Sequence, residues 1–234
     1  MRLYTIKDNQ LRSKLVMLAF SLIIALFIII MTGEGLQWHY LILIRDGEFT
    51  NYASGEMLDS FVQICYMLAA ILIISSMIVF LLWFRRAYDN IHKYELKMPD
   101  SDPSAATWCF FVPFLNLVKP AHIMKEIVEF NETMLKKIDV TYVRPKVTLL
   151  ASVWWLAYIF AGIIGRIDGV LTKNAEDIND YIINIQVSLV ADVLLIISAA
   201  ISLLVVNFIS KEEAKIFKHI STEKELALAP QETA

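Results

Sequence analysis

Four long apolar blocks constrain this chain more than any other feature of its sequence. They cover residues 15–31, 61–84, 147–165 and 182–209, and Asp192 is the only charged residue within them. A helix needs about 20 apolar residues, with a range of about 17–25, to cross the hydrocarbon core of a bilayer. A helix also satisfies its own backbone hydrogen bonds, which lipid cannot do. The blocks therefore predict an all-α membrane protein with four transmembrane helices.

The composition agrees with one membrane domain. Hydrophobic residues make up 57% of the chain, more than the roughly 45–50% of soluble domains. The first apolar block is longer than the core of a signal peptide and no small-x-small cleavage site follows it, so we expect an uncleaved first span. The net charge of −3 is too close to neutral to indicate a nucleic-acid partner.

The charges predict the orientation of the chain. Of the 21 Lys and Arg residues, 18 lie in residues 1–14, in the loop 85–146 or after the fourth block. Because cytoplasmic loops carry the excess of Lys and Arg, both termini and the loop 85–146 are expected in the cytoplasm. The domain plan is a cytoplasmic N-terminus (1–14), a four-helix transmembrane domain (15–221) and a flexible cytoplasmic tail (222–234).

Two loops are expected on the other side of the membrane. Residues 32–60 are rich in acidic side chains, and within them the apolar residues 38–44 are too few to span. Trp38 and Tyr40 are typical of the membrane–water interface, so a short separate interfacial helix is predicted here. The loop 166–182 carries Arg166, Lys173 and several acids.

The middle of the cytoplasmic loop holds an unusual apolar segment, residues 108–120, which we call the central segment. It is too short to cross a bilayer, and Pro113 and Pro120 each break or restart a helix. Broken backbone at membrane depth persists only where protein or water satisfies it. The segment is therefore predicted to be re-entrant or interfacial, with Trp108, Pro113 and Pro120 as its structural motif.

Helical patterns flank the central segment. Phe84, Tyr88, Ile91 and Tyr94 recur at three- and four-residue spacing, so the second helix is expected to continue to about residue 98. Asp102 before Pro103 predicts the start of the helix that carries Trp108. Residues 120–139 predict an amphipathic surface helix. Its apolar stripe is Ile123, Met124, Ile127, Val128, Met134, Leu135 and Ile138, and its polar face includes Lys125, Glu126 and Glu129.

Asp192 is the first candidate functional residue. A charge at the centre of a span costs at least about 2.5–3.5 kcal/mol, so Asp192 is expected to face other helices and to have a partner there. Tyr158, Trp155, Ser21, Leu22, Tyr66 and Ala70 are expected near its depth. Asp192 and Tyr158 form the predicted intramembrane polar site. Either Asp192 holds helices together by a hydrogen bond, or it is a proton or cation site without a second carboxylate beside it.

The second candidate is a polar cluster on the cytoplasmic side: Arg85, Arg86, Asn90, Asn116, Lys119 and His122. Cations beside apolar surface at this level suit anionic lipid headgroups. The alternative is that these side chains only snorkel towards water. His122 alone is no metal site, and Cys65 and Cys109 lack the spacing of metal ligands, so no metal or cofactor is predicted.

Motifs of common enzymes are missing from the sequence. There is no Walker A, His-Glu-x-x-His, Gly-x-Ser-x-Gly or dinucleotide-binding glycine pattern. The favoured function is a non-enzymatic membrane protein that binds a partner protein, a second copy or anionic lipid at its cytoplasmic face. The alternative is a small transporter or a lipid-modifying enzyme that uses Asp192 or the Arg85, Asn116 and Lys119 group, and whether the protein is an enzyme stays open.

Three motifs lie along the second half of the second block and the regions after it: Trp83, Arg86, Ala87 and Asn90; Trp108, Phe111, Val112, Pro113, Asn116, Leu117, Pro120, Met124 and Ile127; then Trp154, Trp155, Gly165 and Arg166. Over about residues 60–215 these motifs resemble a bacterial membrane family known as domain of unknown function 4328. The resemblance implies a compact four-span bundle, and implies no activity, substrate or catalytic residues. We expect the bundle in the bacterial inner membrane. The tail departs from the pattern at Ser210–Glu213, where a Thr and a Gln are expected.

Overall fold

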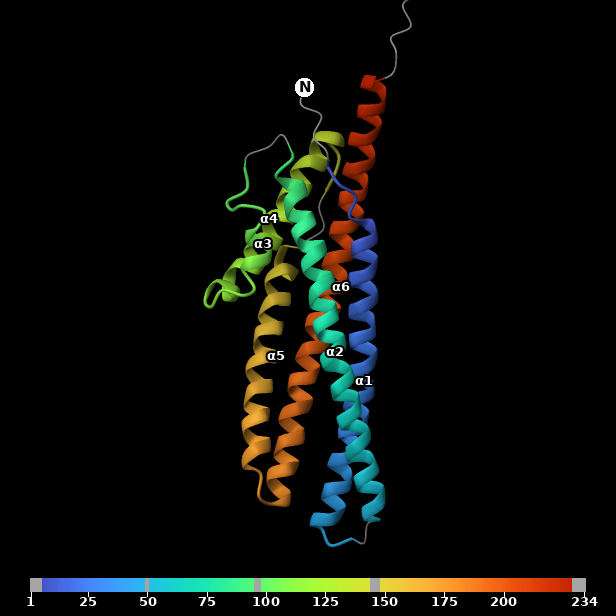
Figure 1. Ribbon diagram of the computed structural model, residues 1–234, viewed down its shortest axis with the longest axis vertical. Helices are drawn as coiled ribbons and strands as arrows, with labels where there is room; N and C mark the ends of the chain where they lie inside the picture. The colour runs from blue at the N-terminus through green and yellow to red at the C-terminus, as the bar shows by residue number, and fades with distance from the viewer. Residues whose placement is uncertain (1–5, 49–50, 95–97, 144–147, 229–234) are drawn as a thin grey trace, which may run out of the picture. The chain divides into compact units, whose positions relative to one another are not determined.

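The computed structural model describes residues 6–48, 51–94, 98–143 and 148–228. All regular structure in these residues is helical, which confirms the all-α prediction (Figure 1). The helices are α1 (Gln10–Arg45), α2 (Tyr52–Ile91), α3 (Ala105–Trp108), α4 (Leu115–Ile138), α5 (Thr148–Asn174) and α6 (Ile178–Leu228).

Four helices, α1, α2, α5 and α6, are long and apolar enough to cross a membrane. This finding confirms the prediction of a multi-pass membrane protein. The described chain forms two compact units, and these four helices contribute to both. We call Leu18–Met77 with Val153–Leu203 the four-helix unit, and Met1–Met17, Ile78–Ser152 and Leu204–Ala234 the α3–α4 unit.

Helix α1 is longer than its apolar block. It continues to Arg45, so the separate interfacial helix predicted for residues 38–44 is wrong, and those residues are the end of α1. Glycines let α1 pack closely against α2. A Cβ added at Gly33 would lie 2.6 Å from Val62, and one at Gly55 would lie 2.7 Å from the ring of Tyr40. This close packing against α2 lies beyond residues 15–31, the apolar block from which the first span was predicted.

The other helix ends also differ from the predictions. Helix α5 reaches Asn174 and α6 starts at Ile178, so most of the predicted loop 166–182 is helical. The part of the tail predicted to be flexible is helical as far as Leu228. The predicted start of the third span at Val147 and residues 229–234 of the tail lie outside the described residues. Helices α5 and α6 therefore continue through polar residues beyond their apolar blocks. A hydropathy pattern marks only the apolar part of a helix and does not locate its ends.

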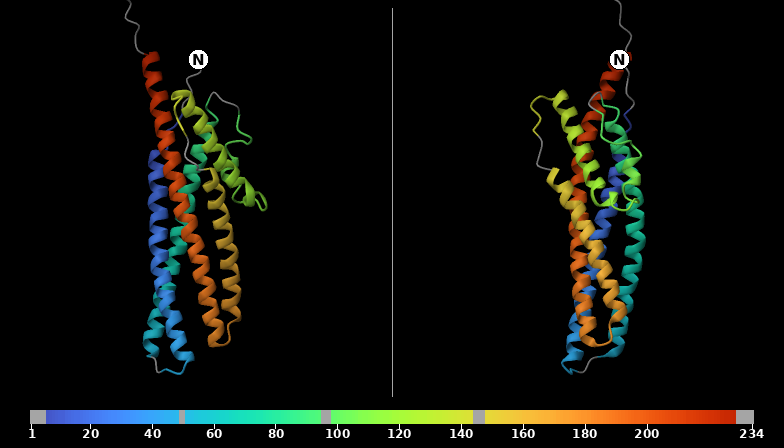
Figure 2. Two further views of the ribbon diagram at one scale, coloured as in Figure 1. Left: turned by 180° about the vertical axis from the view of Figure 1, so that it is seen from behind. Right: turned by 90° about the vertical axis from the view of Figure 1, so that its left-hand side faces the viewer.

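The four-helix unit is apolar on its surface and polar at several buried positions. Segments of α1, α2, α5 and α6 lie side by side in it (Figures 1 and 2). Its hydrophobic core is made by Ile23, Phe27, Ile30, Cys65, Ala69 and Ala199. Ile28 and Ile71 are exposed, whereas Ser188 and Asp192 are buried. Polar groups inside and apolar groups outside suit a unit whose surroundings are lipid.

The α3–α4 unit contains the central segment. Phe110 packs edge-on against Phe80 and Phe84 of α2, with ring centroids 6.1 and 5.7 Å apart. Phe114, which is 84% exposed, separates α3 from α4 and has a φ of 65°. A side chain in the left-handed region costs about 1–2 kcal/mol, so this break is strained. The break follows Pro113 directly, at a position where the sequence predicted one.

Other predictions for this unit need correction. Pro120 lies inside α4 and does not break it, because a proline this close to the helix start removes one hydrogen bond and deflects only a short turn. Helix α3 has Ser104, not Asp102, as its N-cap. Helix α2 ends at Ile91 and does not reach residue 98. The N–H groups of Lys93 and Tyr94 donate to the carbonyls three residues earlier, not four as in an α-helix.

Helix α4 buries most of its predicted apolar stripe, including Ile123, Met124 and Ile127, while Met134 and Ile138 are half-buried. Glu126, which the pattern placed on the polar face, is also buried. Two donors explain its position: the Tyr88 hydroxyl donates to Glu126 Oε2 at 2.8 Å, and the Asp100 N–H donates to Oε1 at 2.8 Å. A buried carboxylate with such partners avoids most of the cost of desolvation.

Candidate functional site

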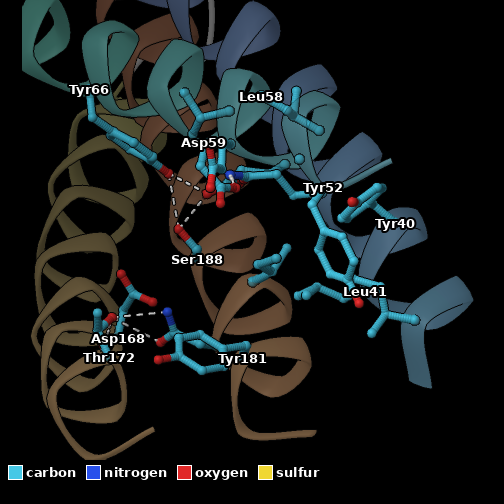
Figure 3. Close-up of a pocket in the computed structure, with 18 residues that line it drawn as sticks. Tyr40, Leu41, Tyr52, Leu58, Asp59, Tyr66, Asp168, Thr172, Tyr181 and Ser188 are labelled. Atoms are coloured by element: carbon cyan, nitrogen blue, oxygen red, sulfur yellow. Dashed lines mark hydrogen bonds between the residues drawn. The ribbon is translucent and has the colours of Figure 1, made fainter. Parts of the chain in front are cut away.

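A cluster of polar side chains lies inside the four-helix unit. Glu34 comes from α1, Tyr66 from α2, and Ser188 and Asp192 from α6. The exposed fractions are 3% for Glu34 and 5% for Asp192. We call these four residues the carboxylate cluster; Figure 3 shows Tyr66 and Ser188 within it.

The Tyr66 hydroxyl is the centre of the carboxylate cluster. It lies 2.5 Å from Glu34 Oε1, 3.0 Å from Ser188 Oγ and 3.0 Å from Asp192 Oδ2. Ser188 Oγ in turn donates to Glu34 Oε1 at 2.7 Å. Tyr66 therefore links two buried carboxyl groups that come from different helices.

The cluster has too few hydroxyl hydrogens for its contacts. Tyr66 and Ser188 each carry one hydrogen, and an ionised carboxylate carries none. Four short contacts must share these two hydrogens. A proton on Glu34 or Asp192 supplies one of the two missing hydrogens, so the arrangement favours a proton on one of the two acids.

Within the described part of the chain, one oxygen of the carboxylate cluster has no hydrogen-bond partner. Glu34 Oε2 is buried and has no hydrogen-bond partner among the described residues. An unsatisfied buried acceptor costs about 1–3 kcal/mol, and more when it is charged. Glu34 is thus the member of the cluster that a ligand would stabilise most.

The cluster borders a cavity of about 620 Å³ in the same unit. Four carboxylates, Glu34, Glu56, Asp59 and Asp168, line this cavity, and no Lys or Arg is present among the described lining residues. Figure 3 shows Tyr66 and Ser188 on one side of it and Asp168 and Tyr181 on another. The lining tyrosines are Tyr40, Tyr52, Tyr66 and Tyr181. The volume suits a small organic ligand.

The sequence located half of this site. Tyr66, one of the neighbours expected for Asp192, bonds to it, and Ser188 is buried four residues before Asp192 on the same helix. The expectation that no second carboxylate accompanies Asp192 is wrong, because Glu34 lies on a helix and not in a loop. Its signal was present in the pattern, since Ile23, Phe27, Ile30 and Glu34 follow a 4-3-4 spacing.

Tyr158 lies elsewhere. Its side chain is 45% exposed and its ring stacks on Trp155 at 5.2 Å. No hydrogen bond to Asp192 is described for it, and Tyr66 holds that position.

The structure distributes the predicted cytoplasmic cluster over several places in the α3–α4 unit. Arg85 and Arg86 line a cavity of about 320 Å³ with Lys7, Arg12 and Asp89, which we call the basic cleft. Asn90 has a structural role. Its Oδ1 accepts the N–H of Lys7 at 3.1 Å and its Nδ2 donates to the Lys7 carbonyl at 2.9 Å.

The other three predicted residues lie on α4. Asn116 is in its first turn, where its N–H donates to the Val112 carbonyl at 3.1 Å. His122 lines a different cavity, with Asp100 and Glu126. Burial raises the pKa of the Cys109 thiol to about 12, against the smaller lowering effects of a backbone hydrogen bond and of the Lys119 charge. Cys109 is therefore protonated and unreactive at neutral pH.

The comparison with family models decides the classification. The model described as "Domain of unknown function (DUF4328)" matches residues 47–211, which is more than half of the chain. The chain belongs to the DUF4328 family. The match includes the central segment, Tyr66, Ser188 and Asp192, whereas Glu34 precedes it. Among curated proteins and solved structures, nothing matches this DUF4328 protein.

Replacement of Tyr66 by Phe tests whether its hydroxyl holds the cluster together. Tyr66→Phe removes the shared donor and leaves the buried Glu34 and Asp192 with fewer partners. We expect the free energy of unfolding in detergent to fall by about 1–3 kcal/mol. Tyr158→Phe is the matched control and should change it by less than about 0.5 kcal/mol. Equal effects of the two substitutions would contradict the assignment.

Proposed function

We propose that this DUF4328 protein binds an organic cation in the cavity beside the carboxylate cluster, and that it acts as a small membrane carrier for that cation. The observation that carries the proposal is Glu34, which is buried, lines the cavity and has one oxygen without a hydrogen-bond partner among the described residues. A cationic ligand would supply the missing partner.

Charge favours a cation over any other ligand. Four carboxylates line the cavity, and its described lining residues contain no base. Two unit charges about 4 Å apart attract each other by roughly 4 kcal/mol at an effective dielectric constant of 20. An anion in the same place would be repelled by Glu34, Asp59 and Asp168.

The aromatic lining favours an organic cation over a bare metal ion. Tyr40, Tyr52, Tyr66 and Tyr181 all line the cavity. Aromatic faces attract ammonium groups by about 0.5–2 kcal/mol each and are the usual recognition elements for quaternary ammonium ligands. A volume of about 620 Å³ is also far larger than a single ion requires.

The shortage of hydroxyl hydrogens in the carboxylate cluster indicates how cation binding would be coupled to the release of a proton. Without ligand, a proton on Glu34 or Asp192 adds a hydrogen-bond donor to the contacts around Tyr66. When a cation binds beside Glu34, its charge stabilises the ionised carboxylate, and the proton leaves. Exchange of a cation for a proton at one intramembrane site is the elementary step of a proton-coupled carrier.

Substitution of Glu34 tests the proposal. With choline and ethylammonium as probes, we expect purified protein to bind at least one of them, measured by isothermal titration calorimetry. Glu34→Gln removes the counter-ion and should weaken that binding by at least about tenfold. Glu56→Gln removes a carboxylate from an exposed position in the same cavity and should have a smaller effect.

A neutral analogue completes this experiment. The alcohol 3,3-dimethylbutan-1-ol has the shape of choline without its charge and should not bind. The proposal fails if neither cation binds, if the alcohol binds as tightly as choline, or if Glu34→Gln binds both cations like the unmodified protein.

A second function is favoured by the basic cleft. Lys7, Arg12, Arg85 and Arg86 line it against one acid, Asp89. The exposed aromatic residues Trp108, Phe111 and Phe114 belong to the same unit, and such side chains insert readily at a membrane surface. Together these features favour binding of an anionic lipid headgroup, as the sequence suggested for Arg85 and Arg86.

Lipid binding can be measured by native mass spectrometry with phosphatidylglycerol and phosphatidylcholine. Each basic residue near a membrane surface contributes about 1 kcal/mol to binding of anionic lipid. The double variant Arg85→Gln/Arg86→Gln should therefore retain phosphatidylglycerol at least about tenfold less well. Lys136→Gln/Lys137→Gln removes the same charge from the end of α4 and is the control. Equal retention by both double variants would exclude a headgroup site in the cleft.

The proposed orientation places both termini in the cytoplasm of a bacterial cell. Because Cys65 and Cys109 are buried, an introduced cysteine should be the main reactive thiol. Ser54→Cys at the start of α2 should react with an impermeant maleimide added to intact cells. Ser104→Cys before α3 should react only after lysis. Labelling of the second variant in intact cells would reverse the orientation.

A further inference from the structure

Three metal-binding side chains converge in the α3–α4 unit, and none of them lines the basic cleft. Asp100 precedes α3, and His122 and Glu126 lie four residues apart on one face of α4. One ligand atom from each residue lies within 4.8 Å of the other two. From this convergence we propose that Asp100, His122 and Glu126 form a binding site for a divalent transition-metal ion such as Zn²⁺.

The distances suit zinc coordination. His122 Nε2 and Asp100 Oδ2 are 3.3 Å apart. Zinc bonds of about 2.0–2.1 Å in a tetrahedron place neighbouring ligand atoms roughly 3.3 Å apart. Glu126 must approach slightly to complete the set. One imidazole nitrogen and two carboxylate oxygens favour Zn²⁺ or a similar transition metal over Mg²⁺, which prefers oxygen ligands alone.

Two hydrogen bonds fix the position of the Glu126 carboxylate. It is 6% exposed, and its two oxygens accept hydrogen bonds from the Tyr88 hydroxyl and from the Asp100 N–H, both at 2.8 Å. Each carboxylate oxygen has two lone pairs, so both keep one for a metal ion. Outer partners of this kind orient metal ligands, and their removal costs about 10–100-fold in metal affinity.

The site is open to solvent through the exposed side chains of His122 and Asp100, and a third carboxylate lies nearby. A cavity of about 350 Å³ is lined by Asp100, His122, Glu126 and Glu129. Glu129 lies three residues after Glu126 on α4 and pairs with Lys125 at 3.7 Å. The cavity leaves room for water or for Glu129 at the fourth position that a zinc ion with three protein ligands requires.

Titration of the purified full-length protein with Zn²⁺ tests the site. We expect one equivalent to bind, and we expect His122→Ala and Asp100→Asn each to weaken this binding at least about tenfold. Tyr88→Phe should weaken it by about tenfold while all three ligands remain. His219→Ala is the matched control, because His219 and Glu223 form another His–Glu pair at four-residue spacing on a helix, 3.3 Å apart.

Cobalt gives an independent readout. Co²⁺ in a tetrahedral or five-coordinate protein site absorbs visible light strongly, so the unmodified protein and His219→Ala should become coloured and His122→Ala should not. If no Zn²⁺ binds, or if His122→Ala binds it as tightly as His219→Ala does, then His122 and Asp100 form only a hydrogen bond and the proposal is overturned.

Discussion

The carboxylate cluster depends on the cost of placing acids among apolar helices. Glu34 and Asp192 are both almost completely buried in a unit whose surface is apolar. An isolated charge there would cost several kcal/mol, so the acids persist only with partners. Tyr66 and Ser188 supply those partners, and the helices that carry them are held in register by the same hydrogen bonds. The hydroxyl of Tyr66 therefore links both acids and the helices that carry them.

The hydrogen bonds of the carboxylate cluster are incomplete among the described residues, and this bears on its role. Structural polar seams in membrane proteins generally pair all their groups, whereas here the described residues leave one oxygen of Glu34 unpaired beside an acidic cavity. A purely adhesive role for Asp192 would not require this arrangement. The proposed cation carrier gives the unpaired oxygen, the tyrosines and the carboxylate lining one common explanation.

Hydropathy predicted the four spans, but the site needed the structure. Charge-free blocks mark where lipid surrounds a helix, yet Glu34 lies after the first block and so fell in a predicted loop. Similarly, the pattern placed Glu126 on a polar face, because it could not show that Tyr88 and the Asp100 backbone would satisfy it. Periodicity locates apolar faces well. It does not reveal which polar groups from distant segments meet.

Infrared difference spectroscopy of the protein with and without bound cation tests the central claim most directly, since a protonated carboxyl and a carboxylate absorb at different frequencies. If Glu34 and Asp192 share a proton that the cation displaces, binding should remove a protonated-carboxyl band and create a carboxylate band. Asp192→Asn and Glu34→Gln should each abolish or shift this change. Cation binding without any change in carboxyl protonation would contradict the account.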